Sequence, residues 1–224
     1  MEIILSINAG SSSVKISVYK SAEKDDAPNQ LAEAEISGLT SPPAELKYTR
    51  GDEKIQGKEI DGIKTQEDAF RHILDHLVDD NGLSELAHKD DIHFTCHRVV
   101  HGGDYPRSQI IDEETYHHIE ELSDLAPLHN APALDIVRAV SQALPRSKNI
   151  AYFDSSFHAT MPKHIRTYPI NQERAEKNKL RKYGFHGISY SFIVHAVSHT
   201  STGDLTTVLT TSRSQHTLKS PRKI

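Results

Sequence analysis

Hydrophobic and polar positions alternate with a period of two near the start of the chain, which is typical of strands. Residues 3 to 7 form an apolar run, and residues 14 to 19 place Val14, Ile16 and Val18 on one face. Residues 31 to 36 alternate in the same way, with alanine and isoleucine on one face and glutamate on the other. With the small, polar turn of residues 10 to 13 between the first two runs, this pattern predicts an antiparallel hairpin sheet.

Farther along the chain the apolar period lengthens to that of a helix. The apolar stripe over residues 66 to 79 predicts an amphipathic helix. Further helices are predicted over 112 to 124, over 131 to 144 with Asn130 as N-cap and Pro132 in the first turn, and over 187 to 199. Strands are predicted over 92 to 100 and 150 to 153, and 40 to 65 is expected to be irregular or weakly extended. An opening hairpin sheet followed by alternating strands and helices indicates an α/β fold.

Three polar residues stand where predicted strands end. Asn8 ends the first strand, Arg98 lies near the end of the strand that begins at Ile92, and Asp154 follows the strand that begins at Ile150. Open α/β sheets bind ligands outside the carboxyl ends of their strands, so these side chains are expected to converge if their strands are neighbours. The alternative is that each is simply a polar strand end.

The turn Gly10-Ser-Ser-Ser13, followed by Lys15, has two interpretations. A glycine-rich turn directs backbone N–H groups at an anion, three hydroxyls add donors, and Lys15 adds charge. It is not a P-loop, because a strand rather than a helix follows it. The alternative is an ordinary serine-rich β-turn.

Composition narrows the class of protein. The 224 residues are 36% hydrophobic and 25% charged with a net charge of -5, which is typical of a soluble globular protein and gives no reason to expect a nucleic-acid partner. The lone cysteine, the absence of a signal-peptide pattern and the absence of an apolar run long enough to span a membrane predict a cytoplasmic protein without a membrane partner.

Two isolated histidines and the single cysteine are weaker candidates for functional residues. His72 and His76 have the i, i+4 spacing of metal ligands but no nearby third ligand. Cys96 alternates with Phe94 and is expected to lie on a core face as a small hydrophobe rather than act as a nucleophile.

Five longer strings resemble the acetate kinase family in order along the chain. They are ILSINAGSSSVK at 4 to 15, HRVVHGG at 97 to 103, LAPLHNAP at 125 to 132, FDSSFHATMP at 153 to 162 and YGFHGIS at 183 to 189. The resemblance implies a ribonuclease H-like, actin-like ATPase domain. It also implies a magnesium-dependent kinase that moves a phosphoryl group reversibly from ATP to acetate, giving acetyl phosphate and ADP.

The resemblance assigns the candidate catalytic residues. Arg98 matches the arginine that grips the acetate carboxylate or acetyl phosphate, and Asp154 matches the catalytic acidic residue. His186 matches the histidine that stabilises the transition state, and His129 matches a second histidine on the phosphate side. Phosphoryl transfer needs positioning and charge neutralisation rather than a covalent nucleophile, and these residue types suit it.

The resemblance also assigns binding residues. Asn8 matches a magnesium-site residue. The phosphate side of the nucleotide site is matched by Ser11, Ser13 and Lys15, and the apolar pocket for the acetate methyl group by Val100, Leu128 and Phe185. Because one methylene changes binding by only about 1–3 kcal/mol, propionate is an expected secondary substrate.

Two departures from the family pattern limit this interpretation. Tyr190 stands where the family usually has histidine, and the resemblance decays after about Val197. Residues 1 to 199 are therefore expected to form the N-terminal domain, with 200 to 224 as a divergent, disordered tail and the C-terminal nucleotide domain missing. The family forms homodimers largely through that missing domain, so we do not expect one here. The alternative to an active kinase is a catalytically inactive fragment, acting at most as an anion-binding or interaction module.

Overall fold

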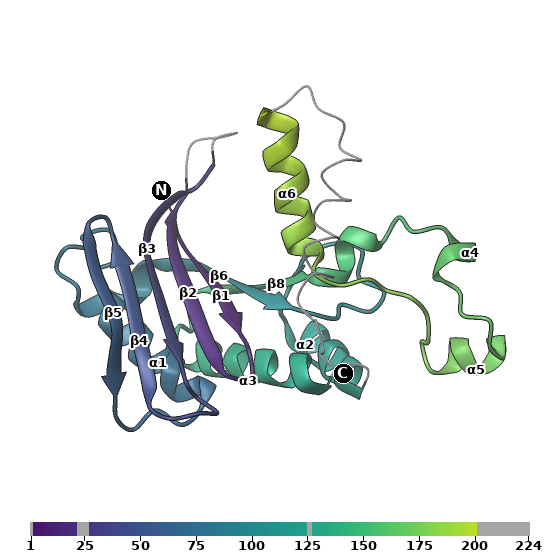
Figure 1. Cartoon of the computed structure of the whole chain (residues 1–224), viewed down its shortest axis with the longest axis horizontal. Coiled ribbons are helices and arrows are strands. Elements are labelled where there is room, and N and C mark those ends of the chain that lie inside the picture. The colour runs from purple at the N-terminus through teal and green to yellow at the C-terminus, as the bar shows by residue number, and fades with distance from the viewer. Residues whose placement is uncertain (1, 22–26, 125–126, 201–224) are drawn as a thin grey trace, which may run out of the picture.

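The computed structural model describes residues 2–21, 27–124 and 127–200, within which one mixed sheet forms the centre of the molecule (Figure 1). The sheet has eight strands in the order β5-β4-β3-β2-β1-β6-β8-β7. The predicted tail begins at residue 200, and residues 201–224 lie outside the described part of the chain. Their predicted disorder therefore stays a prediction.

The first half of the sheet is an antiparallel meander. Its strands are β1 (Ile3–Ala9), β2 (Ser13–Lys20), β3 (Asn29–Ser37), β4 (Ala44–Arg50) and β5 (Glu53–Ile60). The predicted opening hairpin is confirmed, and Val14, Ile16 and Val18 are fully buried. Of the irregular or weakly extended structure expected over 40 to 65, the extended alternative is the one found, because β4 and β5 pair there as a further hairpin. The period-two pattern of this segment is weak because β5 is an edge strand without a buried residue.

The second half of the sheet contains the parallel strands. β1 pairs in parallel with β6 (Ile92–Val99), β6 with β8 (Lys148–Phe153), and the short β7 (Gln109–Ile110) closes the edge antiparallel to β8. The expected core face of β6 is wrong beyond Ile92: a register shift pairs Ile3 with Ile92 but Ile4 with Phe94. This bulge turns Thr95 into the core and leaves Cys96 half-buried on the opposite face.

Two helices cover one face of the sheet. α1 (Gln66–Asp79) and α3 (Pro127–Ala143) pack together and against the strands, burying the main hydrophobic core. α2 (Glu113–Glu121) and the short 3-10 turn η2 (Leu122–Asp124) lie beside α3. Asn130 is not the N-cap predicted for α3, because the helix begins at Pro127 and includes Asn130.

The remaining elements follow β8. They are η3 (Asp154–His158), α4 (Lys163–Arg166), α5 (Gln172–Lys177) and α6 (Gly187–Thr200). One further short turn, η1 (Lys89–Asp91), comes earlier in the chain and precedes β6. Figure 1 shows α6 rising on the sheet's other side from α3, while α4 and α5 form an arm that extends away from the sheet. Among the described residues, no helix is long and apolar enough to cross a membrane.

Candidate active site

The three polar strand ends converge, as the sequence predicts for neighbouring strands. The Arg98 guanidinium donates two hydrogen bonds to Asp154 Oδ2, from Nη2 at 2.8 Å and from Nε at 3.2 Å. Its Nη1 also donates to Asn8 Oδ1 at 3.3 Å. The parallel pairing of β1, β6 and β8 brings these residues to one edge of the sheet.

Asp154 and Arg98 differ in how far their charged groups are buried. The Asp154 side chain is 2% exposed, whereas that of Arg98 is 35% exposed. Taking a carboxylate out of water is unfavourable unless it is paired, and Arg98 supplies the pairing. Arg98 therefore binds Asp154 and Asn8 with part of its guanidinium, and the exposed part of the group is accessible to an anion.

His186 completes this group from a different part of the chain. It lines a cavity of about 550 Å³ together with Asn8 and Arg98. Its φ of 59° is unusual for a residue with a side chain, and such strain persists only where the surroundings impose it. The next residue, Gly187, packs so closely that an added Cβ would lie 2.1 Å from Asp154 O. Glycine is therefore needed where α6 begins.

Two of the three residues matched to the acid pocket, Val100 and Phe185, have described side chains. Val100 directly follows β6 and is half-buried, and Phe185 is 43% exposed with its ring centroid 5.8 Å from that of His101. The side chains of Leu128 and His129 lie outside the described ones. Their assignments remain predictions.

The opening turn is held by protein contacts. Gly10 N donates to Ser13 O at 2.8 Å, and the Gln66 side chain donates to Gly10 O and Ser11 O. Ser11 is exposed and Ser13 is half-buried. Lys15 pairs with Glu33 of β3 at 2.8 Å; burial alone would raise the pKa of Glu33, but the contact with Lys15 lowers it. The Lys15 ammonium is therefore directed at β3.

The oxygen atoms at the strand ends fit part of a magnesium site. Asn8 and Asp154 offer amide and carboxylate oxygens, both of which now accept hydrogen bonds from Arg98. The described residues contain no group of three or more histidine, cysteine or acidic side chains able to hold a metal ion. Mg²⁺ typically takes one or two protein oxygens and completes its shell with phosphates and waters, so this donor set fits.

Sequence reasoning missed the residues that support the site. Asn130 is fully buried, and its side-chain amide pairs with the backbone of His101 through bonds of 3.2 and 3.0 Å. His158 Nε2 donates to Phe185 O at 3.0 Å. Asn130, His101, His158 and Phe185 all lie in the quoted family strings, but spacing alone gave no reason to connect them.

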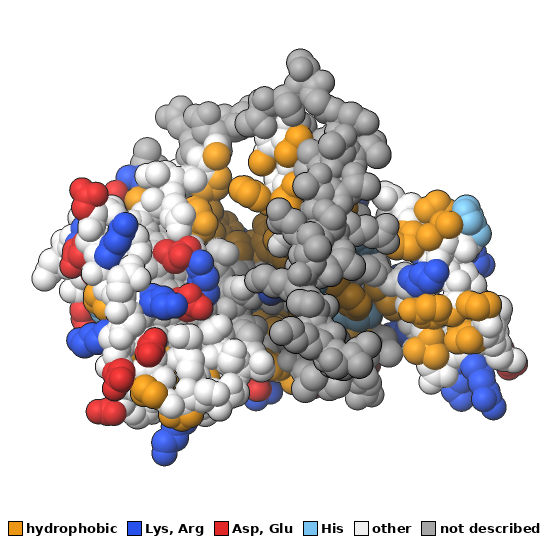
Figure 2. Space-filling model, in the orientation of Figure 1, with side chains coloured by type: hydrophobic (Ala, Val, Ile, Leu, Met, Phe, Trp, Pro, Cys, Tyr) orange, Lys and Arg blue, Asp and Glu red, His pale blue; other side chains and the backbone are white. Residues whose placement is uncertain are grey.

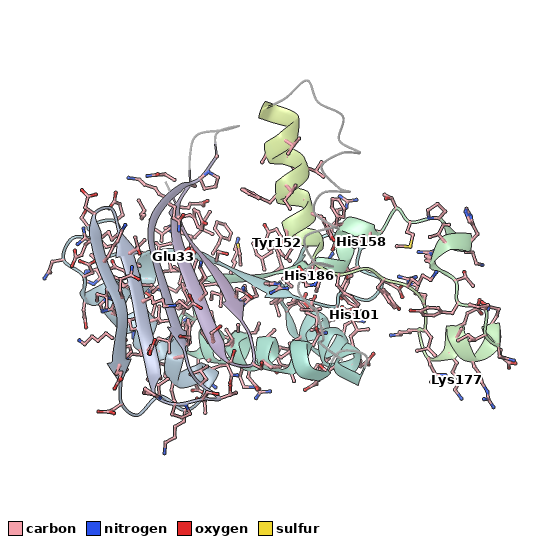
Figure 3. The ribbon with its side chains drawn as sticks, in the orientation of Figure 1. Glu33, His101, Tyr152, His158, Lys177 and His186 are labelled. Carbon is pink, nitrogen blue, oxygen red and sulfur yellow. The ribbon has the colours of Figure 1, made fainter. Side chains whose placement is uncertain are left out.

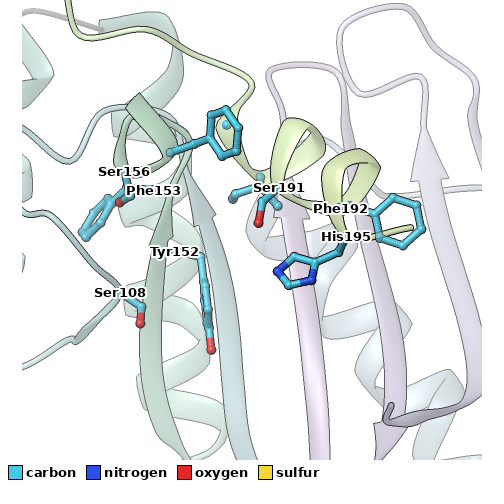
Figure 4. A pocket seen from close by; sticks show the side chains of 10 residues that line it. Ser108, Tyr152, Phe153, Ser156, Ser191, Phe192 and His195 are labelled. Atoms are coloured by element: carbon cyan, nitrogen blue, oxygen red, sulfur yellow. The ribbon is translucent and has the colours of Figure 1, made fainter. Parts of the chain in front are cut away.

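A second, mainly apolar cavity of about 560 Å³ lies on the other side of the first turn of α6. Tyr152, Phe153 and Ser156 line it from β8 and η3, and Phe192 and His195 line it from α6 (Figure 4). Hydrophobic side chains gather in the hollow between the sheet and α6, as far as Figure 2 shows them. Phe192 is 74% exposed.

Comparison with known proteins shows what the chain resembles. A model of the acetokinase family matches residues 3–209. A probable acetate kinase from Chaetomium globosum is 57% identical over 198 residues, covering 88% of this chain and 43% of the relative. The crystal structure of Porphyromonas gingivalis acetate kinase is 33% identical with a TM-score of 0.75, covering 85% of this chain and 46% of that one. A propionate kinase from Francisella tularensis matches with 31% identity and a TM-score of 0.75.

These likenesses confirm the expected actin-like ATPase fold and define how much of it is present. The match with the Francisella kinase covers 88% of this chain but 48% of that one. The chain thus spans less than half the length of these relatives.

Proposed function

Because the chain belongs to the acetokinase family, we propose that it carries the acid- and phosphate-binding half of an acetate kinase site. The reaction proposed is reversible transfer of a phosphoryl group from ATP to acetate, giving acetyl phosphate and ADP. The observation that carries the proposal is that Arg98 is held by Asp154 and Asn8 and lines the same cavity as His186.

The residues around Arg98 are given roles that suit their chemistry. The exposed part of the Arg98 guanidinium binds the carboxylate of acetate or the phosphate of acetyl phosphate. Asp154 fixes the guanidinium and orients the substrate, and His186 donates to the transferring phosphoryl group as charge develops on its oxygens. Mg²⁺, held by Asn8 and Asp154, would neutralise phosphate charge. His129, Ser11, Ser13 and Lys15 are proposed for the phosphates, where Lys15 would exchange its pairing with Glu33 for a phosphate oxygen. Val100, Leu128 and Phe185 are proposed for the methyl group.

Coverage of the relatives favours a second candidate function. More than half of each relative's length has no counterpart in the alignment, and residues 1–199 are proposed to form only the N-terminal part of the enzyme. Orienting two substrates requires contacts from both sides of a cleft, and a small loss of geometry lowers the rate steeply. A polypeptide limited to these 224 residues would then bind anions or an intact subunit without turnover.

One assay with a parallel binding measurement separates these functions. The 224-residue chain is incubated with acetate, ATP and Mg²⁺, and acetyl phosphate is trapped as its hydroxamate, while calorimetry measures acetyl phosphate binding. Binding that is lost in Arg98→Ala but kept in Arg138→Ala supports the proposed half-site, since Arg138 is an exposed arginine of α3. Turnover lost in Asp154→Ala supports the kinase over the fragment. If the folded protein shows no binding and no turnover, the half-site itself is contradicted.

Replacing acetate with propionate in the same assay tests acid preference. A family member titled propionate kinase shares this fold, so use of both acids is expected, with a difference of about 10- to 200-fold in kcat/KM.

A further inference from the structure

The segment that presents His186 has an unusual backbone. Residues 183 to 186 lie in neither a helix nor a strand and lead directly into α6. Gly184 has a φ of 81° and His186 a φ of 59°, so two of the four residues are left-handed. A side chain at such a position is held by its surroundings rather than by its own preference. The contacts that impose this conformation therefore decide where His186 points.

His101, which lies two residues after β6, packs against this segment; Figure 3 labels it together with His186. The residue is 2% exposed, and its ring centroid lies 4.3 Å from that of Tyr183 and 5.8 Å from that of Phe185. His101 itself is fixed: Asn130 pairs with its backbone, and Gly103 N donates to its Nδ1 at 3.0 Å. Because Nδ1 accepts, the ring is neutral with its proton on Nε2.

The surroundings of His101 keep it in that state. Burial lowers the pKa of His101, and the nearby positive charge of Arg181 lowers it further, while Asp104 opposes them. A neutral imidazole is the form that the bond from Gly103 requires.

His158 holds the same segment from η3. Its Nε2 donates to Phe185 O at 3.0 Å, the carbonyl immediately before His186. The ring also lies against Gly184, where an added Cβ would approach within 2.4 Å of it. A carbonyl only accepts, so Nε2 of His158 carries a proton whichever charge state the ring adopts.

We propose that His101 and His158 are positioning residues that clamp segment 183–187 from two sides and thereby aim His186 into the cavity it shares with Arg98. Ring packing from His101 sets the lateral position of Tyr183 and Phe185, and the hydrogen bond from His158 sets the orientation of the peptide that precedes His186. The clamp rests on geometry; its effect on acetyl phosphate rests on the proposed function.

The test uses the full 224-residue chain with paired variants. His101→Leu removes both the acceptor and the aromatic ring, while His101→Asn retains an acceptor without the ring. His158→Leu removes the donor, while His158→Gln retains one. His164→Leu is the matched control, because His164 is an exposed histidine on α4. The readouts are amide hydrogen exchange across residues 184–190, exchange in α1 as the measure of global stability, and acetyl phosphate affinity.

We expect amides 184–187 to exchange about tenfold faster in both leucine variants, with α1 unchanged. His158→Gln should restore most of the protection, and His164→Leu should have no effect. Acetyl phosphate affinity should fall and recover in parallel. Imidazole nitrogen shifts in the wild type should show His101 in the Nε2–H form.

Three results would overturn the clamp. One is unchanged exchange at 184–187, another is an equal rise in α1, and the third is His158→Gln behaving like His158→Leu. If the wild-type chain binds no acetyl phosphate, the proposed function fails, and the exchange data still decide the clamp.

Discussion

At the scale of single residues, the site depends on one arginine that serves two partners. Arg98 compensates the charge of buried Asp154 and also reaches Asn8, so its position is fixed before any ligand binds. Preorganisation of this kind lowers the entropic penalty of binding. Removing the arginine should consequently affect folding as well as binding.

We predict that Arg98→Met lowers the free energy of unfolding by about 3 kcal/mol, because it leaves the carboxylate of Asp154 buried and unpaired. Adding Asp154→Asn to this variant should recover part of the loss by removing the buried charge. Urea unfolding at pH 7 measures both effects.

Arg138→Met is the control for this comparison. Arg138 pairs with Asp135 on the surface at 3.7 Å, so its replacement should change stability by less than about 1 kcal/mol. Equal losses for Arg98→Met and Arg138→Met would contradict the predicted role of burial.

At the scale of elements, a buried polar network ties β6, β8 and α3 together beneath the site. Thr95 Oγ1 and His97 Nε2 both donate to Asn149 Oδ1, at 2.7 and 2.8 Å. Asn149 Nδ2 donates in turn to Ser141 Oγ of α3 at 3.2 Å. Because buried polar groups are costly when unpaired, this network fixes how β6 sits beside β8. It therefore supports the alignment of Arg98 with Asp154.

This network makes stability depend on pH. Burial lowers the pKa of His97 to about 4, partly offset by its hydrogen bond with Asn149. In the unfolded chain a histidine has a pKa of about 6.5, so between the two values the unfolded state binds the extra proton. Stability should be fully present above about pH 6.5 and decrease as the pH falls toward 4, with a loss of about 2 kcal/mol by pH 5.

Denaturant unfolding at pH 7 and pH 5 tests this prediction. His97→Gln keeps a donor for Asn149 but does not titrate, so its loss on acidification should be smaller by that amount. His117→Gln, at an exposed histidine of α2, should keep the wild-type pH dependence. The same pH dependence in wild type and His97→Gln would rule out His97 as its source.

At the scale of the whole molecule, α6 has a surface that the described chain leaves partly open. Apolar residues occur on every side of this helix, a pattern typical of a helix buried in a larger protein. The exposed apolar residues around its cavity are Tyr152, Phe157, Ile188 and Phe192. An apolar surface of this kind commonly marks an interaction site.

Although the sequence offers no reason to expect the family homodimer, we predict that the 224-residue chain self-associates through this apolar surface, and that Phe192→Glu reduces the association because it places a charge on the surface. Light scattering coupled to chromatography over a concentration series measures the effect, and binding of a hydrophobic dye should fall with it. Ile110→Glu is the matched control, since Ile110 is 62% exposed on β7 and does not line the cavity. Equal behaviour of the two variants would exclude the α6 surface as the site of association.

The sequence by itself determined the elements whose apolar period is strong and the residue types of the site. Val14, Ile16 and Val18 on one strand face, and the stripe along α1, were predicted because burial of one face imposes a regular period. The polar strand ends were recognised because side chains that interrupt an apolar run are conspicuous. Strand ends and family strings together predicted Asn8, Arg98 and Asp154 as site residues.

Only the tertiary structure decided what depends on contacts between distant segments. The bulge that turns Thr95 inward comes from pairing with β1, and β5 pairs as an edge strand without a buried face. Similarly, the clamp of His101 and His158 joins segments separated by dozens of residues. A local pattern records burial along one element, whereas register and side-chain contacts depend on the partner strand or loop, and the partner is fixed only when the chain folds.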